Sequence, residues 1–341
     1  MSAGTNQPAV LVTGGSGYLG GSIVIALLKA GHTVRTTIRD LAREGAVRAT
    51  LERHAPTGQL TFYAANLLAN TGWDAAADGV GHVIHVASPM PVREYKGQDL
   101  VTPAREGTRR VLQAAQRAGV RHVVMTSSVV AATWAATGEA PTDGTVWTDL
   151  SDKGVSLYAR SKTLAEQDAW AFARASNGGM TLTTILPGSV QGLVLGQEVS
   201  GSLELPWRML TGRLPLLPRV SFACVDTSDL ADLHVRALTD PRARGERIVA
   251  ASRPLWLRQM AQLLKARLGE RATKVSTREA PDWLIRAVAF VSADARFLVP
   301  DLGKQRFFSP AMAESILGRP LRSSEEAIAS AAESLIANGA V

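Results

Sequence analysis

The chain has 341 residues, of which 46% are hydrophobic and 20% charged, a composition typical of a globular protein with a sizeable core. Its formal net charge is +7, but the arginines are scattered and alternate with acids, as in Arg43-Glu44. Because they form no basic block, we expect no nucleic-acid-binding surface. The single cysteine, Cys224, excludes an intrachain disulfide, and the six histidines include no H-E-x-x-H pair, so we expect no metal.

The sequence also gives no sign of export or of a membrane segment. The first ten residues, M-S-A-G-T-N-Q-P-A-V, lack the charged and apolar regions of a secretory signal. No uninterrupted apolar run approaches the roughly 18 residues that a spanning helix needs. We therefore expect a cytoplasmic protein that does not bind membranes, either a monomer or a homodimer.

Short strand-like segments alternate with longer helical patterns through the first 190 residues. Strands are predicted at 9–13, 33–38, 60–65, 82–87, 121–127 and 181–186. Helices are predicted near 18–30, 41–53, 98–118 and 156–176, and Gly31 and Gly119 suit the ends of two of them. This alternation predicts an α/β fold with a doubly wound, Rossmann-type parallel sheet.

After about residue 187 the pattern changes, and proline and glycine become frequent. Helices are predicted near 202–211, 227–239, 255–268, 282–290 and 323–338, with one short strand near 248–250. We expect residues 1–190, joined by 220–252, to form the dinucleotide-binding domain. Residues 191–341 would form a smaller, mainly helical substrate-binding lobe, and the two would make one compact unit.

Residues 13–20, T-G-G-S-G-Y-L-G, fit two glycine patterns at once. Gly15, Gly17 and Gly20 satisfy G-x-G-x-x-G, whereas Gly14, Gly17 and Gly20 satisfy G-x-x-G-x-x-G. The loop follows a predicted strand and precedes a predicted helix, whose N-terminal N–H groups and dipole favour a pyrophosphate. The sequence therefore predicts dinucleotide binding, but periodicity does not choose between the two glycine registers.

The end of the second predicted strand bears on the choice between NAD and NADP. In T-V-R-T-T-I-R-D, Arg35 and Arg39 bracket the strand end, with Arg43 one turn further on. Asp40 stands where an NAD-binding acid is expected, but it falls just past the strand. Guanidinium groups suit a 2′-phosphate, so NADP(H) is the predicted cofactor. The alternative is that these arginines only solvate the strand edge.

Tyr158 and Lys162 form the pair Y-x-x-x-K at the start of a predicted helix, where i, i+4 spacing places them on one face. A neighbouring ammonium stabilises a phenolate and so favours proton transfer from Tyr158. The preceding predicted strand ends in Ser127 and Ser128, and strand ends face the ligand crevice of a parallel sheet. Together these residues predict a Ser–Tyr–Lys site.

The sequence resembles the extended short-chain dehydrogenase/reductase family, and within it the dihydroflavonol-reductase-like and aldehyde-reductase branch. The resemblance covers nearly the whole chain. The motifs that carry it are T-G-G-S-G-Y-L-G (13–20), T-V-R-T-T-I-R-D (33–40), H-V-A-S-P-M (85–90), T-S-S (126–128), Y-A-R-S-K-T-L-A-E (158–166), L-P-G (186–188) and V-D-T-S-D-L-A-D-L-H (225–234).

The resemblance implies roles for individual residues. It selects Gly14, Gly17 and Gly20 as the defining glycines, so that Gly15 becomes a position that a small residue could occupy. It implies Ser128 as the active-site serine, Tyr158 as the general acid, and Lys162 as the lysine that also holds the nicotinamide ribose. The expected cofactor contacts are Thr13, Gly14, Ser16, Gly17, Tyr18, Leu19, Gly20, Arg35, Arg39, Asn66, Leu67, Ala87, Ser88, Pro89, Thr126 and Pro187.

Two departures from the family pattern accompany these assignments. Asn66 stands where similar proteins often have aspartate near the adenine, and an amide can still accept and donate there. The asparagine of the four-residue proton relay has no match in P-A-R-E-G-T (103–108).

For the substrate pocket, analogy with the family's variable lobe points to Met90, Val129, Trp134, Leu193 and Trp207. That apolar set favours a bulky or aromatic carbonyl compound, although each residue could equally belong to the core.

The primary hypothesis is therefore an NADPH-dependent reductase that converts a ketone or aldehyde into an alcohol. One alternative is an NAD-dependent sugar-nucleotide epimerase or dehydratase, but the segment after Ser128, V-V-A-A-T-W, has no acid of the kind the dehydratases use. Another is a non-catalytic NADP-binding sensor, although such proteins typically lose the tyrosine or the lysine of the pair, and both Tyr158 and Lys162 are present.

Overall fold

The computed structural model describes residues 8–89, 99–132 and 140–341. The chain packs into two compact units. The first comprises Met1–Ser127, Arg160–Ile185 and Ala231–Ile248, and the second comprises Ser128–Ala159, Leu186–Leu230 and Val249–Val341. Among the described residues, no helix is long and apolar enough to cross a membrane.

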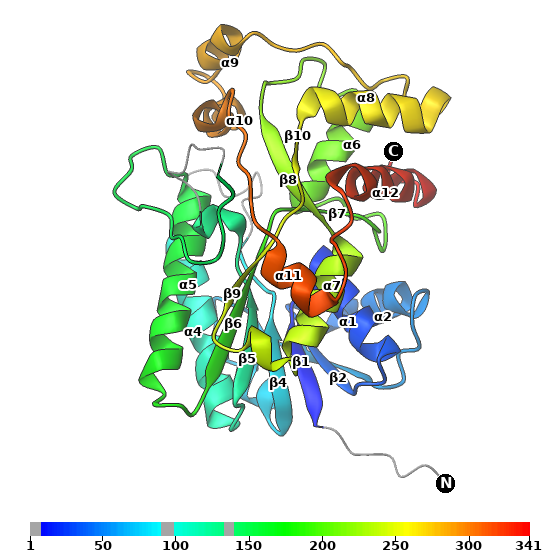
Figure 1. The fold of residues 1–341 in the computed structure, drawn as a ribbon. Helices are drawn as coiled ribbons and strands as arrows, with labels where there is room; N and C mark the ends of the chain where they lie inside the picture. Colours follow the sequence, from blue (N-terminus) through cyan, green and yellow to red (C-terminus); the bar gives the residue numbers. More distant parts are fainter. Residues whose placement is uncertain (1–7, 90–98, 133–139) are drawn as a thin grey trace. The chain divides into compact units, whose positions relative to one another are not determined.

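A seven-stranded sheet forms the centre of the first unit, in the order β3-β2-β1-β4-β5-β6-β9 (Figure 1). Its strands are β1 (Ala9–Thr13), β2 (Val34–Ile38), β3 (Leu60–Ala64), β4 (Val80–His85), β5 (His122–Thr126), β6 (Thr181–Pro187) and β9 (Arg247–Ala250). The order reverses between β1 and β4, where open α/β sheets bind their ligands. The predicted Rossmann-type fold is confirmed.

Helices cover this sheet because their apolar faces match its buried strands. The helices that follow the first strands are α1 (Tyr18–Lys29), α2 (Glu44–Glu52), α3 (Trp73–Ala77), α4 (Val101–Arg117) and α5 (Leu157–Ala175). A single core cluster joins α3, α4 and α5 to the strands through residues such as Trp73, Leu112 and Ala169. Figure 1 shows α4 and α5 side by side on one side of the sheet.

The second unit contains a three-stranded sheet in the order β10-β8-β7. The strands are β7 (Ser189–Gln191), β8 (Ser221–Asp226) and β10 (Pro254–Trp256); β7 pairs with β8 in parallel and β10 with β8 antiparallel. The sequence pattern predicted only one strand in this part of the chain, at 248–250, and it missed this sheet. β7 and β10 have three residues each, too few for an alternating pattern to show.

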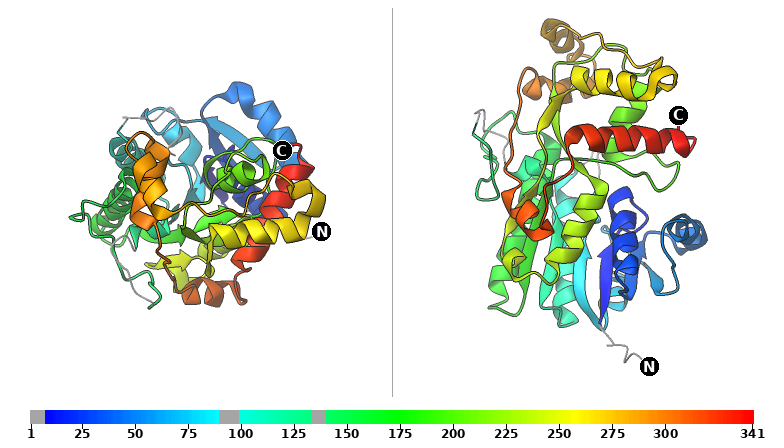
Figure 2. Two further views of the ribbon diagram at one scale, coloured as in Figure 1. Left: turned by 90° about the horizontal axis from the view of Figure 1, so that it is seen from above. Right: turned by 45° about the vertical axis from the view of Figure 1, so that its right-hand side comes forward.

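The helices after residue 187 are α6 (Glu204–Leu210), α7 (Thr227–Ala237), α8 (Leu257–Leu268), α9 (Asp282–Val288), α10 (Ala293–Leu298), α11 (Ala311–Leu317) and α12 (Ser324–Ala337). α12 begins with a capping box, in which Ser323 and Glu326 satisfy each other's backbone N–H groups. It packs against α8 and β8 (Figure 2). Five of these helices lie where the sequence predicted them, whereas the short α10 and α11 were not predicted.

Candidate active site

The glycine loop connects β1 to α1 with its tip exposed at Ser16 and Gly17. Gly14 has φ +77°, a conformation that favours glycine, and its N–H donates to Thr37 Oγ1 at 3.1 Å. A Cβ on Gly20 would lie 2.2 Å from the Gly14 carbonyl oxygen, so only glycine permits this approach. Gly17 is the N-cap of α1 and offers no side-chain cap to the first turn, and helix N-termini of this kind favour an anion.

The expectation that Gly15 tolerates a small residue is wrong. A Cβ there would lie 2.0 Å from Thr36 Oγ1 and 2.9 Å from Thr36 Cβ. Thr36 has no room to move, because it is fully buried in β2 and its hydroxyl donates to the Val12 carbonyl at 2.8 Å. By contrast, a Cβ on Gly17 would meet only the Gly14 oxygen, at 3.3 Å. Matching a glycine pattern does not reveal which glycine faces a neighbouring strand.

Hydrogen bonds of Thr13 with His85 and the residues after it connect the C-terminal ends of β1 and β4. Thr13 Oγ1 accepts the N–H groups of Val86 and Ala87, each at 3.0 Å, so its own proton goes to His85 Nδ1 at 2.9 Å. His85 then carries its proton on Nε2, which donates to Thr108 Oγ1 at 3.3 Å. Burial, with a smaller effect of the Lys162 charge, lowers the pKa of His85 to about 3, so the ring is neutral.

The structure places Ala87 beside the glycine loop and shows what the side chains of Asn66 and Thr126 contact. A Cβ on Gly14 would lie 3.1 Å from the Ala87 Cβ, so Ala87 borders the glycine loop. Asn66 Oδ1 accepts the N–H of Leu68 at 3.0 Å and shapes the turn after β3. Thr126 is buried, and its hydroxyl lies 2.8 Å from His234 Nε2.

The two arginines of the second strand lie at opposite ends of it. Arg35 is near the start of β2, where it donates to the carbonyls of Asp78 and Ala76 and stacks 5.3 Å from the Tyr63 ring centre. Arg39 follows the strand and is exposed. Four residues of strand separate their backbones by roughly 13 Å. The structure therefore leaves Arg39, and not Arg35, at the carboxyl end of β2.

Ser128 and Tyr158 meet through a side-chain hydrogen bond. Ser128 follows β5 and caps a short 3₁₀ turn, with its Oγ 3.4 Å from the Val130 nitrogen. Tyr158 is the second residue of α5 and is partly buried. Burial raises the pKa of its phenol above the ordinary value, and the hydrogen bond with Ser128 opposes that rise. The tyrosine is therefore held as the protonated acid beside a hydroxyl.

Lys162 lies one turn further along α5 and is almost fully buried. Burial lowers the pKa of its ammonium to about 8, and the nearby Glu166 carboxylate opposes that shift. Lys162 therefore carries its charge at neutral pH in a place that disfavours charge. The sequence analysis did not single out Glu166, although it continues the four-residue spacing of Tyr158 and Lys162 along one helix face.

Residues 11–189 of the chain match the family described as 3-beta hydroxysteroid dehydrogenase/isomerase. Dihydroflavonol 4-reductase of Zea mays is 32% identical over 276 residues, which cover 78% of this chain and 76% of that protein. The chain belongs to the 3-beta hydroxysteroid dehydrogenase/isomerase family. Cinnamoyl-CoA reductase CAD2 of Medicago truncatula is 32% identical over 253 residues, covering 72% of this chain and 76% of that protein.

Solved structures agree on the fold. The yeast methylglyoxal/isovaleraldehyde reductase Gre2, complexed with NADPH, superposes with a TM-score of 0.79 at 19% identity, over 98% of this chain and 100% of that one. The matches confirm the predicted resemblance to the extended short-chain dehydrogenases/reductases and its dihydroflavonol-reductase-like branch, which are oxidoreductases.

Of the five residues predicted for the substrate pocket of this family member, Met90 and Trp134 lie outside the described residues. Val129 is half-buried against a small core cluster, and Leu193 is 47% exposed. Trp207 donates its indole N–H to the Ala340 carbonyl at 2.9 Å, and the Arg213 guanidinium stacks 4.5 Å from its ring centre. Trp207 therefore also anchors the C-terminal residues.

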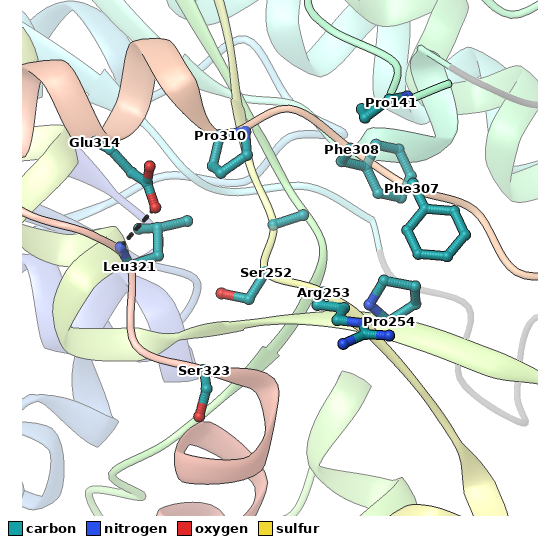
Figure 3. Close-up of a pocket in the computed structure, with 11 residues that line it drawn as sticks. Pro141, Ser252, Arg253, Pro254, Phe307, Phe308, Pro310, Glu314, Leu321 and Ser323 are labelled. Atoms are coloured by element: carbon teal, nitrogen blue, oxygen red, sulfur yellow. Dashed lines mark hydrogen bonds between the residues drawn. The ribbon is translucent and has the colours of Figure 1, made fainter. Parts of the chain in front are cut away.

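A hollow of about 360 Å³ lies within the second unit (Figure 3). Three prolines and two phenylalanines line it together with Arg253, Glu314 and two serines; the lining residues are Pro141, Ala251, Ser252, Arg253, Pro254, Phe307, Phe308, Pro310, Glu314, Leu321 and Ser323. None of the residues predicted for cofactor, substrate or catalysis is among them. In the part of the chain that the structure describes, no group of three or more His, Cys, Asp or Glu could hold a metal ion.

Proposed function

We propose that this protein is an NADPH-dependent reductase that converts a ketone or aldehyde into an alcohol. The observation that carries the proposal is the hydrogen-bonded pair of Ser128 and Tyr158, with the buried Lys162 one turn along the same helix as the tyrosine. The names of the relatives support it, because dihydroflavonol 4-reductase and cinnamoyl-CoA reductase both reduce carbonyl compounds.

The glycine loop fits a dinucleotide. Gly20 has no side chain where α1 approaches the Gly14 carbonyl, and Ser16 and Gly17 are exposed where a pyrophosphate would bind. The exposed Arg39, which follows β2, would hold the 2′-phosphate. NADPH in a complex with the yeast reductase supports the choice of cofactor. When bound, NADPH supplies the hydride.

Residues of this chain then stabilise the negative charge that develops on the carbonyl oxygen and supply the proton. Ser128 donates a hydrogen bond to the carbonyl oxygen, which becomes more basic as the carbon is reduced. Tyr158 gives its phenolic proton to that oxygen, and this completes the alcohol. The Lys162 ammonium stabilises the phenolate left behind. A lysine with a pKa of about 8 is charged at neutral pH, as this role requires.

We further propose that residues 1–190, with 220–252, bind the cofactor and that 191–341 supply the substrate side, with Val129, Leu193 and Trp207 among its contacts. These apolar side chains suit a bulky or aromatic carbonyl compound, and the relatives named for dihydroflavonols and cinnamoyl thioesters agree with that class.

The test is a cofactor-consumption assay with NADPH and NADH over aryl ketones, aldehydes, flavanonols and sugar nucleotides. We expect turnover of an aryl carbonyl with NADPH and little with NADH. Purified protein that retains NAD and converts a sugar nucleotide without net oxidation would replace the proposal with the epimerase reading. Dinucleotide binding without turnover of any carbonyl compound would favour a sensor.

A further inference from the structure

Glu166 is a buried carboxylate surrounded by hydrogen-bond donors. It is fully buried on α5, and its Oε2 accepts from Ser127 Oγ at 2.6 Å. Its Oε1 accepts from Thr184 Oγ1 at 2.7 Å and from Arg247 Nε at 2.8 Å. Arg247 Nη2 lies 3.3 Å from Oε2, and Trp170 Nε1 lies 3.4 Å from Oε1. All five residues belong to the first unit.

This arrangement surrounds the Glu166 carboxylate with hydrogen-bond partners. Each carboxylate oxygen receives at least two donors, and the guanidinium of Arg247 has no acceptor to offer. Arg247 is only 9% exposed and supplies the opposite charge. A single buried carboxylate thus connects β5, β6, β9 and α5.

The same carboxylate adjoins two members of the proposed catalytic set. Ser127, which donates to it, is the residue directly before Ser128. Lys162 is one helical turn before Glu166, so their side chains share a face of α5. The hydrogen bond to Ser127 fixes the strand end that presents Ser128, and the negative charge stabilises the Lys162 ammonium.

We propose that Glu166 is a positioning residue for the Ser128–Tyr158–Lys162 set, that it holds Lys162 in its charged form, and that Arg247 limits this effect. The inference rests on the proposed function. It assigns a role in the reaction to a residue that touches neither of the proposed reacting hydroxyls.

The direction of the pH effect follows from the groups that face Lys162. On α5 that group is Glu166, and from β4 it is His85, whose pKa of about 3 keeps it neutral. Burial already lowers the Lys162 pKa to about 8. Without the Glu166 charge the pKa falls further, so Lys162 loses its proton at a lower pH. The alkaline limb of the kcat–pH profile then moves toward acid.

The experiment measures kcat between pH 6 and 10 for Glu166→Gln in the full chain, with Asp168→Asn as the matched control. Asp168 lies on the same helix but is 40% exposed and pairs with Arg105 at the surface. We expect the alkaline limb to move down by roughly 0.5–1 pH unit in Glu166→Gln and to stay in place in Asp168→Asn. A purely structural role would lower kcat at every pH without moving the limb.

Two further variants keep the test decisive. Glu166→Asp retains the charge, so its limb should stay near that of the wild type even if kcat falls. If Glu166→Gln alone does not fold, Glu166→Gln/Arg247→Met removes the buried pair together, which proteins often tolerate, and its limb should still lie below that of the wild type. An unmoved limb in the folded variant would overturn the inference. Absence of carbonyl turnover in the wild-type protein would instead count against the proposed function.

Discussion

The glycine loop and helix α5 contribute to the proposed site through opposite physical means. Around the loop, side chains are absent where the backbone passes close to its neighbours, as at Gly20 beside the Gly14 oxygen and Gly15 beside Thr36. Along α5, polar side chains are buried, and Lys162 and Glu166 stand one turn apart with little contact with water. The loop is therefore sensitive to added atoms, whereas α5 is sensitive to changes of charge or proton.

This difference predicts different readouts for variants of the two regions. Substitutions in the loop should change dinucleotide affinity and stability, because they alter shape. Isosteric substitutions of the buried polar residues on α5 should change kcat and its pH dependence, because they leave shape intact.

The largest effect is expected for Tyr158→Phe, which removes only the phenolic hydroxyl. Without the proton donor, kcat should fall by about 10²–10⁴-fold. The dissociation constant for NADPH, measured by fluorescence titration, should change little because the ring and the fold remain. A kcat close to that of the wild type would remove Tyr158 from the mechanism and with it the contrast between the two regions.

Gly15→Ala should have the largest effect on the loop side. The new Cβ would overlap Thr36 Oγ1, and relieving this overlap in a packed sheet costs about 1–3 kcal/mol. Urea unfolding should show that loss. Gly17→Ala is the matched control, since its Cβ would meet only one atom, at 3.3 Å, and it should cost less. Equal losses at the two positions would mean that the loop relaxes around Thr36.

These two predictions also mark how far sequence analysis reaches. The alternation of strands and helices, the Tyr158–Lys162 spacing and the strand end at Ser128 are local patterns, and each is found in the structure where it was expected. The clash at Gly15 depends on Thr36 in the next strand, which no local pattern contains. Glu166 lay within a quoted motif, but its donors Ser127, Thr184 and Arg247 come from three other strands or strand ends. Burial and contacts between distant segments decide these cases.

The buried, neutral ring of His85, hydrogen-bonded to Thr13, predicts that the free energy of unfolding decreases in acid. The pKa of His85 is about 3 in the folded chain and about 6.5 when the ring is exposed. Below pH 6.5 the unfolded chain therefore binds a proton at His85, whereas the folded chain does not. Stability from this group is complete above pH 6.5 and is lost as the pH falls toward 3. Between pH 7 and 5 the loss should be about 2 kcal/mol.

Urea unfolding at pH 7 and pH 5 measures this loss. His85→Gln can still accept from Thr13 and donate to Thr108, but it does not titrate, so its stability should fall less between the two pH values. The pKa values of His82 and His122 are also lowered by burial, and they remain in both proteins, so the difference between variant and wild type isolates His85. The same pH dependence in both proteins would show that His85 accepts a proton in the folded state.

The smallest effect is expected for Arg39→Ala, at the outer edge of the loop region. Loss of one exposed guanidinium should raise the KM for NADPH about tenfold, or about 1.4 kcal/mol, and leave the KM for NADH nearly unchanged. Arg35→Ala is the control, because the Arg35 guanidinium already donates to the carbonyls of Ala76 and Asp78 at the end of α3. It should lower stability without changing the ratio of the two KM values. If Arg35→Ala changed that ratio and Arg39→Ala did not, the 2′-phosphate would be recognised from the start of β2. The preference for NADPH over NADH would then not depend on the carboxyl end of β2, although parallel sheets generally bind their ligands at that end of their strands.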